Sequence, residues 1–193
     1  MRVRRERFQV VEDDGRRALM VDGVIQSVAL GENEPPSGYW AAMLPLGDPR
    51  DALFLGLGGG TLPHLLHRRN PNVRMVGVDA DAGVVHFARE QFQLRLPNLE
   101  VVIADAFDFV AGCRHGFDYV AVDLFRGYNL QRGALAKPFL NRLQWIIGAR
   151  GEVSFNLFAD RRTERNMTRL GKVLRVFRVD EVGRNVVVHC RSA

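Results

Sequence analysis

The sequence predicts an α/β fold built around a mostly parallel, Rossmann-like sheet. Five apolar segments have the length and composition of buried strands: 51–57, 73–78, 99–103, 117–122 and 151–157. The connections between them are long enough for crossover helices, which favours parallel pairing. Two more strands are predicted within 173–192, on either side of a turn at Gly183. We therefore expect seven strands, of which the last two form an antiparallel hairpin at one edge.

Helices are expected between and after these strands, at 60–69, 81–94, 106–112, 134–149 and 160–172, with a further short helix at 39–46. Trp145 is expected in the core together with Leu143, Ile146 and Ile147. Before the first long strand, residues 7–30 contain short strands around Asp22-Gly23, a typical hairpin turn. They predict a small N-terminal β appendage, residues 1–36, followed by the main Rossmann-like domain, residues 37–193.

Composition limits the setting of the protein. Hydrophobic residues make up 47% of the 193 residues, but no apolar run approaches the roughly 20 residues that span a bilayer. The charged first residues have no apolar segment behind them, and Cys113 and Cys190 form no pair motif. We expect a cytoplasmic protein without a membrane partner.

The formal net charge is +5, and nearly all the positive charge comes from arginine. A basic protein binds nucleic acid when its charge gathers on one face. The arginines are instead spread along the chain, with clusters at 2–7 and 161–169. We interpret them as scattered surface charge and do not expect nucleic acid as a partner.

A glycine-rich turn, Gly56-Leu-Gly-Gly-Gly60, follows the first long strand. Glycine reaches positive φ without steric cost and lets backbone N–H groups approach a ligand closely. A buried strand, a glycine turn and a helix in this order are typical of a nucleotide-binding α/β fold. The turn alone is a weak signal.

Aspartates follow the next three strands, at Asp79, Asp105 and Asp123. The carboxyl ends of strands in a doubly wound sheet share the edge where ligands bind. Asp79 lies 23 residues after Gly56, which suits a carboxylate that binds ribose hydroxyls. Asp105 suits the exocyclic amine of adenine. A single aspartate at a strand end is more often a helix N-cap, but the succession of signals favours a ligand site.

The turn suits a sulfonium nucleoside better than a dinucleotide. A dinucleotide site needs a third glycine where this chain has Thr61, whereas S-adenosylmethionine has no pyrophosphate. His64 and His67 have no carboxylate or cysteine partner at ligand spacing, so no metal site is expected.

Several motifs together resemble the spermidine synthase (aminopropyltransferase) family, within the S-adenosylmethionine-dependent methyltransferase fold. They are Met20-Val-Asp-Gly-Val-Ile-Gln26, Gly56-Leu-Gly-Gly-Gly60, Asp79-Ala-Asp-Ala-Gly-Val-Val85, Ala104-Asp-Ala-Phe-Asp-Phe109 and Phe117-Asp-Tyr-Val-Ala-Val-Asp123. The resemblance covers about residues 8–158. Its first motif is the one that a plain methyltransferase lacks.

The resemblance implies a co-substrate, S-adenosylmethionine or its decarboxylated form, and a set of residues that contact it. These are Gln26, Gly56, Gly58, Gly59, Gly60, Asp79, Ala80, Asp105 and Ala106. Asp123 would be the general base that removes a proton from the acceptor amine. The family commonly forms dimers, and the N-terminal strands suit a homodimer.

The acceptor side departs from the family. Its D-S-S-D-P loop is Asp123-Leu-Phe-Arg-Gly127 here, so Arg126 stands in place of the second aspartate. A basic loop repels a polyamine, which is a multiple cation. The family's Y-H/Q-E motif is also missing near Tyr39, which either lines the substrate pocket with Trp40 or packs the appendage onto the sheet.

Three functions stay open from the sequence. The first is transfer of an aminopropyl or methyl group to a small-molecule acceptor other than the family's polyamine. The second is a non-catalytic, nucleoside-binding homologue, since a fold does not fix a function. The third, nucleic-acid methylation, is suggested only by the positive net charge.

Overall fold

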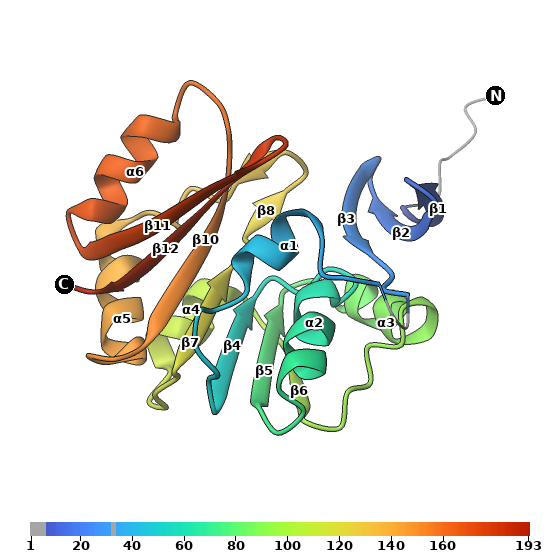
Figure 1. The fold of residues 1–193 in the computed structure, drawn as a ribbon, viewed down its shortest axis with the longest axis horizontal. Helices are drawn as coiled ribbons and strands as arrows, with labels where there is room; N and C mark the ends of the chain where they lie inside the picture. Colours follow the sequence, from blue (N-terminus) through green and yellow to red (C-terminus); the bar gives the residue numbers. More distant parts are fainter. Residues whose placement is uncertain (1–6, 32–33) are drawn as a thin grey trace.

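The computed structural model describes residues 7–31 and 34–193, so the basic cluster at 2–7 lies outside the described residues except for Arg7. A seven-stranded sheet of order β11-β12-β10-β7-β4-β5-β6 forms the centre of the molecule (Figure 1). Its strands are β4 (Asp51–Leu55), β5 (Arg74–Asp79), β6 (Leu99–Ile103), β7 (Tyr119–Val122), β10 (Glu152–Phe158), β11 (Leu174–Val182) and β12 (Asn185–Ser192).

The pairing of these strands confirms the predicted fold class. Strands β6, β5, β4, β7 and β10 are parallel, while β12 is antiparallel to both of its neighbours, β10 and β11. The terminal hairpin is therefore not simply added at the edge of the sheet in chain order. Its second strand, β12, is inserted between β10 and its first strand, β11. This brings the turn between β11 and β12 beside the carboxyl end of β10, where Asn185 pairs with Phe158.

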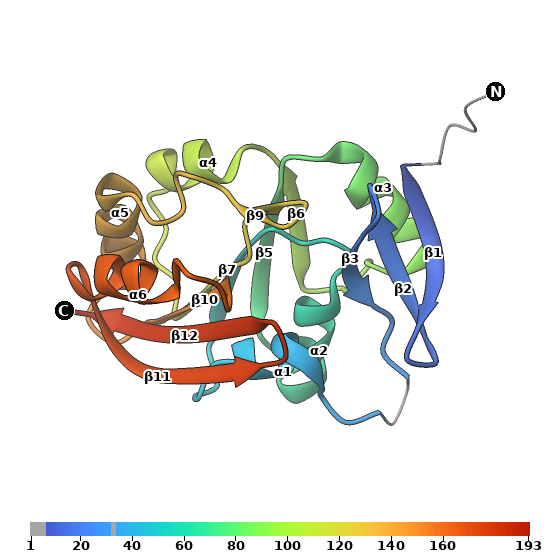
Figure 2. The same ribbon diagram turned by 90° about the horizontal axis from the view of Figure 1, so that it is seen from above.

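Helices cover both faces of the sheet (Figures 1 and 2). They are α1 (Gly38–Met43), α2 (Thr61–Arg69), α3 (Ala82–Gln91), α4 (Ala106–Gly112), α5 (Lys137–Ile147) and α6 (Thr163–Gly171). Residues of α1, α2 and α3 share one apolar core cluster, and residues of α4, α5 and α6 share another. Strand β4 contributes to both clusters, since Phe54 and Leu55 point to opposite faces.

The expectation that Trp145 belongs to the core is wrong. Leu143, Ile146 and Ile147 are buried, but Trp145 is 54% exposed. The reason is the helical period: Trp145 lies about 200° around α5 from Leu143 at 3.6 residues per turn, away from the apolar stripe. Its ring is covered on one side by Arg142, whose guanidinium carbon is 4.1 Å from the ring centroid.

The N-terminal strands form a separate three-stranded antiparallel sheet made of β1 (Phe8–Asp13), β2 (Arg16–Val21) and β3 (Val24–Val28). Asp22 and Gly23 connect β2 to β3 with φ values of 50° and 84°, the positive range that tight hairpins require. Leu19 and Val21 pack with Val84 and Phe92 against α3. The small sheet is therefore held against helix α3, which follows β5.

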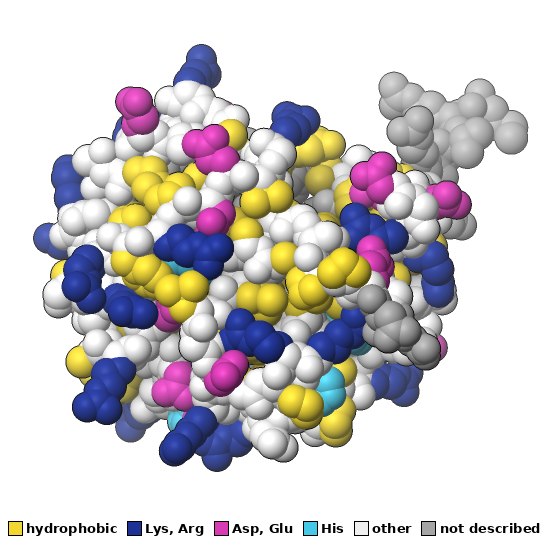
Figure 3. Space-filling view, in the orientation of Figure 1, with side chains coloured by type: hydrophobic (Ala, Val, Ile, Leu, Met, Phe, Trp, Pro, Cys, Tyr) yellow, Lys and Arg dark blue, Asp and Glu magenta, His cyan; other side chains and the backbone are white. Residues whose placement is uncertain are grey.

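The surface agrees with scattered charge. On the face drawn in Figure 3, basic side chains are dispersed among hydrophobic and uncharged ones. The arginines of the 161–169 segment are exposed to solvent. None of the described helices is long and apolar enough to cross a membrane.

Candidate functional site

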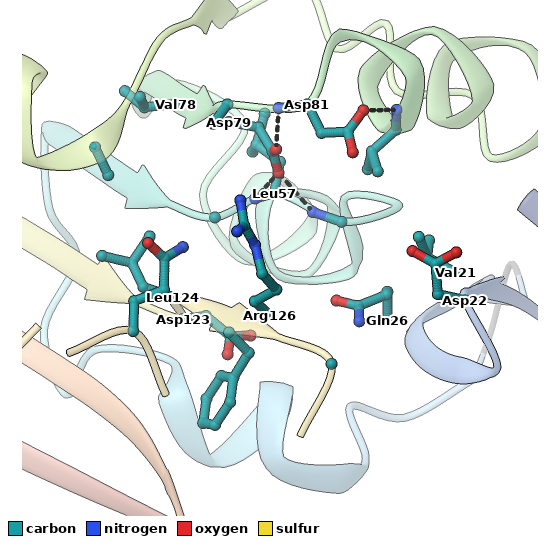
Figure 4. A pocket seen from close by; sticks show the side chains of 18 of the residues that line it. Val21, Asp22, Gln26, Leu57, Val78, Asp79, Asp81, Asp123, Leu124 and Arg126 are labelled. Atoms are coloured by element: carbon teal, nitrogen blue, oxygen red, sulfur yellow. Dashed lines mark hydrogen bonds between the residues drawn. The ribbon is translucent and has the colours of Figure 1, made fainter. Parts of the chain in front are cut away.

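A cavity opens where β4, β5, β6 and β7 end, and we call it the strand-end cavity (Figure 4). Most of the predicted site residues meet in its wall, although nearly 100 positions separate the first from the last. Those in the wall are Gln26, Gly56, Gly58, Asp79, Ala80, Asp105, Ala106 and Asp123. Gly59 and Gly60, which were also predicted to contact a cofactor, are not in this wall.

Glycine is required in the turn because the chain is crowded there. Gly56 and Gly58 have φ values of 90° and 52°. A Cβ atom on Gly56 would collide with the backbone oxygen of Asp123, and one on Gly58 would lie 2.9 Å from the backbone oxygen of Gln26. The turn therefore brings together the two segments that flank the cavity.

The other two glycines fasten the turn to the rest of the fold. Gly59 donates its N–H to the Ser27 hydroxyl at 2.6 Å. Gly60 has φ 86° and packs against Leu94, and next to it the Thr61 hydroxyl both accepts from and donates to the backbone of Val28, at 3.0 and 2.8 Å. Ser27 had no distinguishing signal in the sequence, whereas Thr61 stood out as a departure from the dinucleotide motif.

Asp79 holds the glycine turn. Its Oδ2 accepts from the N–H groups of Leu57 at 3.0 Å and Gly58 at 3.4 Å, and its Oδ1 accepts from Asp81 at 2.9 Å. An ionised carboxylate offers about four lone-pair sites. Three are used by the backbone, which leaves about one for a ligand hydroxyl in the cavity.

Asp105 caps a helix and also lies in the cavity wall. Its Oδ1 caps α4 by accepting from Phe107 at 2.7 Å and Asp108 at 3.3 Å. Its Oδ2 has no hydrogen bond among residues 7–31 and 34–193. Asp105 is thus the N-cap of α4 through Oδ1, and its Oδ2 has no partner among the described residues.

Asp123 lies at the centre of a polar network. Its Oδ1 accepts from the Asn156 amide at 2.8 Å, and its Oδ2 accepts from the Tyr39 hydroxyl at 3.1 Å. Asn156 in turn accepts from the Asn185 amide at 2.9 Å. Burial raises the pKa of the Asp123 carboxyl, although these two hydrogen bonds act to lower it. Burial and the charge of Asp123 also raise the pKa of Tyr39 well above its usual value, so its phenol remains a donor.

A second cavity adjoins the first at Asp123, and we call it the aromatic cavity. Gln26, Asp123, Phe125 and Gly127 line both cavities. The residues found only in the aromatic cavity include Tyr39, Tyr128, Asn156, Phe158 and Arg184. Tyr39 therefore lines a cavity, while its neighbour Trp40 is buried in the core cluster that also contains Ala18 and Val28 of the N-terminal sheet. Among the described residues of this wall, only Asp123 and Arg184 are charged.

Several of these residues escaped sequence-based prediction. Asn156 carried a signal, because it is a polar residue inside the apolar run Phe155-Asn156-Leu157 near the end of a predicted strand. Arg184 carried none, since its position in the wall depends on the insertion of β12 beside β10.

The described residues contain no group of three His, Cys, Asp or Glu side chains placed to hold a metal ion. His64 is half-buried, with its Nδ1 3.0 Å from the backbone oxygen of Gly60. Burial, together with the nearby Arg68, lowers its pKa to about 4. His64 therefore contacts the start of helix α2 and does not line the strand-end cavity.

Sequence comparison finds relatives of two kinds, although no protein-family model matches the chain. It is 34% identical over 118 residues to the eEF1A lysine and N-terminal methyltransferase homolog of Drosophila melanogaster, covering 56% of this chain and 18% of that protein. It is 26% identical over 172 residues to the polyamine aminopropyltransferase of Chromobacterium violaceum, covering 84% of this chain and 66% of that protein. The chain thus spans less than two thirds of the length of these relatives.

Solved structures show the same two kinds of neighbour. A probable spermidine synthase from Corynebacterium glutamicum has a TM-score of 0.77 at 18% identity, covering 95% of this chain and 76% of that one. A spermidine synthase in complex with the transition-state analogue AdoDATO has a TM-score of 0.73 at 15% identity, covering 96% and 73%. Human methyltransferase-like protein 13 in complex with SAH has a TM-score of 0.68 at 21% identity, covering 75% and 72%. These similarities establish the shared fold.

Proposed function

We propose that the chain, which resembles polyamine aminopropyltransferases and methyltransferases in sequence and shares their fold, is a group transferase with an adenosyl sulfonium co-substrate. The co-substrate is S-adenosylmethionine or its decarboxylated form, bound in the strand-end cavity. Asp79 binds the ribose, Asp105 the adenine amine, and the backbone of Gly56 and Gly58 lies along the tail. Gln26 closes the cavity from the N-terminal sheet.

The acceptor is a small molecule held in the aromatic cavity. Its nucleophilic atom attacks the carbon next to the sulfonium, the carbon–sulfur bond breaks, and the electron pair of that bond stays on sulfur as a neutral thioether. The proton of the acceptor passes to Asp123, which the two cavities share. The sulfonium is already a good leaving group, so positioning supplies much of the remaining catalysis.

The observation that carries this proposal is the position of Asp123. It is the one aspartate common to both cavity walls, and burial raises its pKa, which makes it a stronger base than an exposed aspartate. Polyamine synthesis fits less well, because the aromatic cavity offers a cation no second carboxylate and contains Arg184.

A non-catalytic homologue is the second candidate, and one observation favours it. Both oxygens of Asp123 already accept hydrogen bonds from the protein, as those of a purely structural aspartate do. In that case the chain binds the nucleoside without turning it over.

The nucleoside product decides between these functions. Incubation with either co-substrate and a panel of acceptors, followed by mass spectrometry, should show S-adenosylhomocysteine after methyl transfer or 5′-methylthioadenosine after aminopropyl transfer. Either product should depend on the acceptor and fall by about 10²- to 10⁴-fold in Asp123→Asn. Binding of the nucleoside without product from any acceptor would leave the non-catalytic function.

A further inference from the structure

We propose that Arg126 binds the carboxylate of the methionine tail and so selects S-adenosylmethionine over its decarboxylated form. This inference rests on the proposed function, because it requires an adenosyl sulfonium in the strand-end cavity. The sequence alone gave Arg126 a different role, as a charge that repels a polyamine acceptor. The structure directs its side chain to the other cavity.

Arg126 belongs to a two-stranded hairpin above the site. Strand β8 (Phe125–Arg126) pairs with β9 (Asn129–Leu130), and Arg126 faces Asn129 in this pairing. Arg126 lines the strand-end cavity and is absent from the wall of the aromatic cavity, whereas Tyr128 shows the opposite preference. Figure 4 shows the guanidinium extending across the cavity toward Leu57 and Asp79.

The charge of Arg126 is available to a ligand. The other arginine of the same wall, Arg7, is occupied by ion pairs with Asp22 and Asp81. The guanidinium of Arg126 makes no ion pair or side-chain hydrogen bond in the described part of the chain. A guanidinium presents its N–H donors as a planar fork that matches a carboxylate in two parallel hydrogen bonds.

The position of Arg126 matches the tail of the co-substrate. With the adenine at Asp105 and the ribose at Asp79, the tail leaves the ribose along Gly56 and Gly58 toward Asp123. Arg126 lies in the same cavity wall as Gly56, Gly58 and Asp123, and its guanidinium forms no ion pair with a described carboxylate. The tail of S-adenosylmethionine ends in a carboxylate and an ammonium, so Arg126 has a partner. The decarboxylated tail has only the ammonium, which the guanidinium repels.

A consequence concerns the group that moves. Aminopropyl transfer requires the decarboxylated donor, which Arg126 disfavours. With S-adenosylmethionine bound, the methyl–sulfur bond breaks, its electron pair stays on sulfur, and the acceptor lone pair forms the new bond to the methyl carbon.

Calorimetric titration with three ligands tests this proposal. S-adenosylhomocysteine and its decarboxylated analogue differ only in the carboxylate, and 5′-methylthioadenosine lacks the tail beyond a methyl group. The wild-type chain should bind S-adenosylhomocysteine at least about tenfold more tightly than the decarboxylated analogue. Arg126→Met should abolish that difference, Arg126→Glu should reverse it, and neither should change the affinity for 5′-methylthioadenosine. The matched control is Arg132→Met, an exposed arginine of the same loop outside both cavity walls, which should retain the preference.

The failures of the two proposals differ in this experiment. The role of Arg126 is overturned if the wild-type chain binds S-adenosylhomocysteine and its decarboxylated analogue equally well, or if Arg126→Met keeps the preference for S-adenosylhomocysteine. If 5′-methylthioadenosine still binds in either case, the proposed nucleoside site is retained. Absence of binding for all three ligands removes the proposed function and the inference with it.

Discussion

The two cavities that meet at Asp123 are built in different ways. The strand-end cavity takes its wall mainly from the ends of consecutive parallel strands, so its residues recur at each turn from strand to helix. The aromatic cavity collects one to three residues each from β3, α1, the β8–β9 hairpin, β10 and the turn between β11 and β12. The first follows from the regular pattern of the fold, and the second from contacts that only the folded chain makes. We therefore expect changes in the two cavities to affect binding and turnover separately.

The largest difference between the effect on turnover and the effect on binding is expected for Asp123→Asn. Loss of the general base should lower product formation by about 10²- to 10⁴-fold. The amide keeps the shape of the side chain, so the affinity for S-adenosylhomocysteine should change little. Single-turnover rates and calorimetric titration measure the two effects, with Asp108→Asn on an exposed face of α4 as the control. Equal losses of binding and turnover would mean that Asp123 shapes the cavity rather than acting as a base.

The same variant should show a pH-dependent gain in stability. Because the pKa of Asp123 is raised in the folded state, its protonated form stabilises the fold at low pH, and this contribution is lost as the pH rises through the raised pKa. The melting temperature of Asp123→Asn minus that of the wild type should therefore increase with pH above the usual aspartate range and then level off. A difference that does not change with pH would show that the carboxyl has an ordinary pKa.

The next effect is expected on the glycine turn. Gly56→Ala combines a positive φ with a collision against the backbone of Asp123, so the free energy of unfolding should fall by about 2 kcal/mol or more. Gly183→Ala has a similar positive φ of 59° but no atom within 4 Å of the added methyl group, and should lose only about 1–2 kcal/mol. Urea denaturation compares the two. The same loss in both would mean that the turn is not crowded.

The smallest effect is expected in the aromatic cavity, from Tyr39→Phe. This change removes only the hydroxyl that donates to Asp123, a hydrogen bond whose net value is about 0.5–1.5 kcal/mol. Product formation should fall by about 2- to 10-fold, and nucleoside affinity should stay the same. Tyr128→Phe is the matched control, because the Tyr128 hydroxyl has no hydrogen bond within the described residues. A similar fall of product formation in both variants would show that the effect does not depend on the hydrogen bond to Asp123.

The sequence predicted the strand-end cavity because each of its parts follows a local rule. Asp79, Asp105 and Asp123 follow apolar strands, and the parallel sheet places strand ends at one edge. Gly59 and Gly60 show the limit of that reasoning. A glycine in a binding turn can serve the packing beneath it, here against Ser27 and Leu94, instead of the ligand.

The aromatic cavity was largely beyond sequence-based prediction. Arg184 reaches it only because β12 is inserted between β10 and β11, and no periodic pattern encodes the order of strands. Arg126 was recognised as a departure from the related family, but the cavity that it faces depends on the β8–β9 hairpin, which the sequence analysis did not predict.

The central claim is that the strand-end cavity binds an adenosyl sulfonium, and Asp105→Asn tests it most directly. Asparagine caps a helix as well as aspartate does, so α4 and the melting temperature should be preserved. Its amide group, however, puts a donor where the adenine amine needs an acceptor. Calorimetric titration with S-adenosylhomocysteine should show binding to the wild-type chain and an affinity about 10- to 100-fold lower for Asp105→Asn. No binding to the wild type, or equal affinity for the two proteins, would contradict the account.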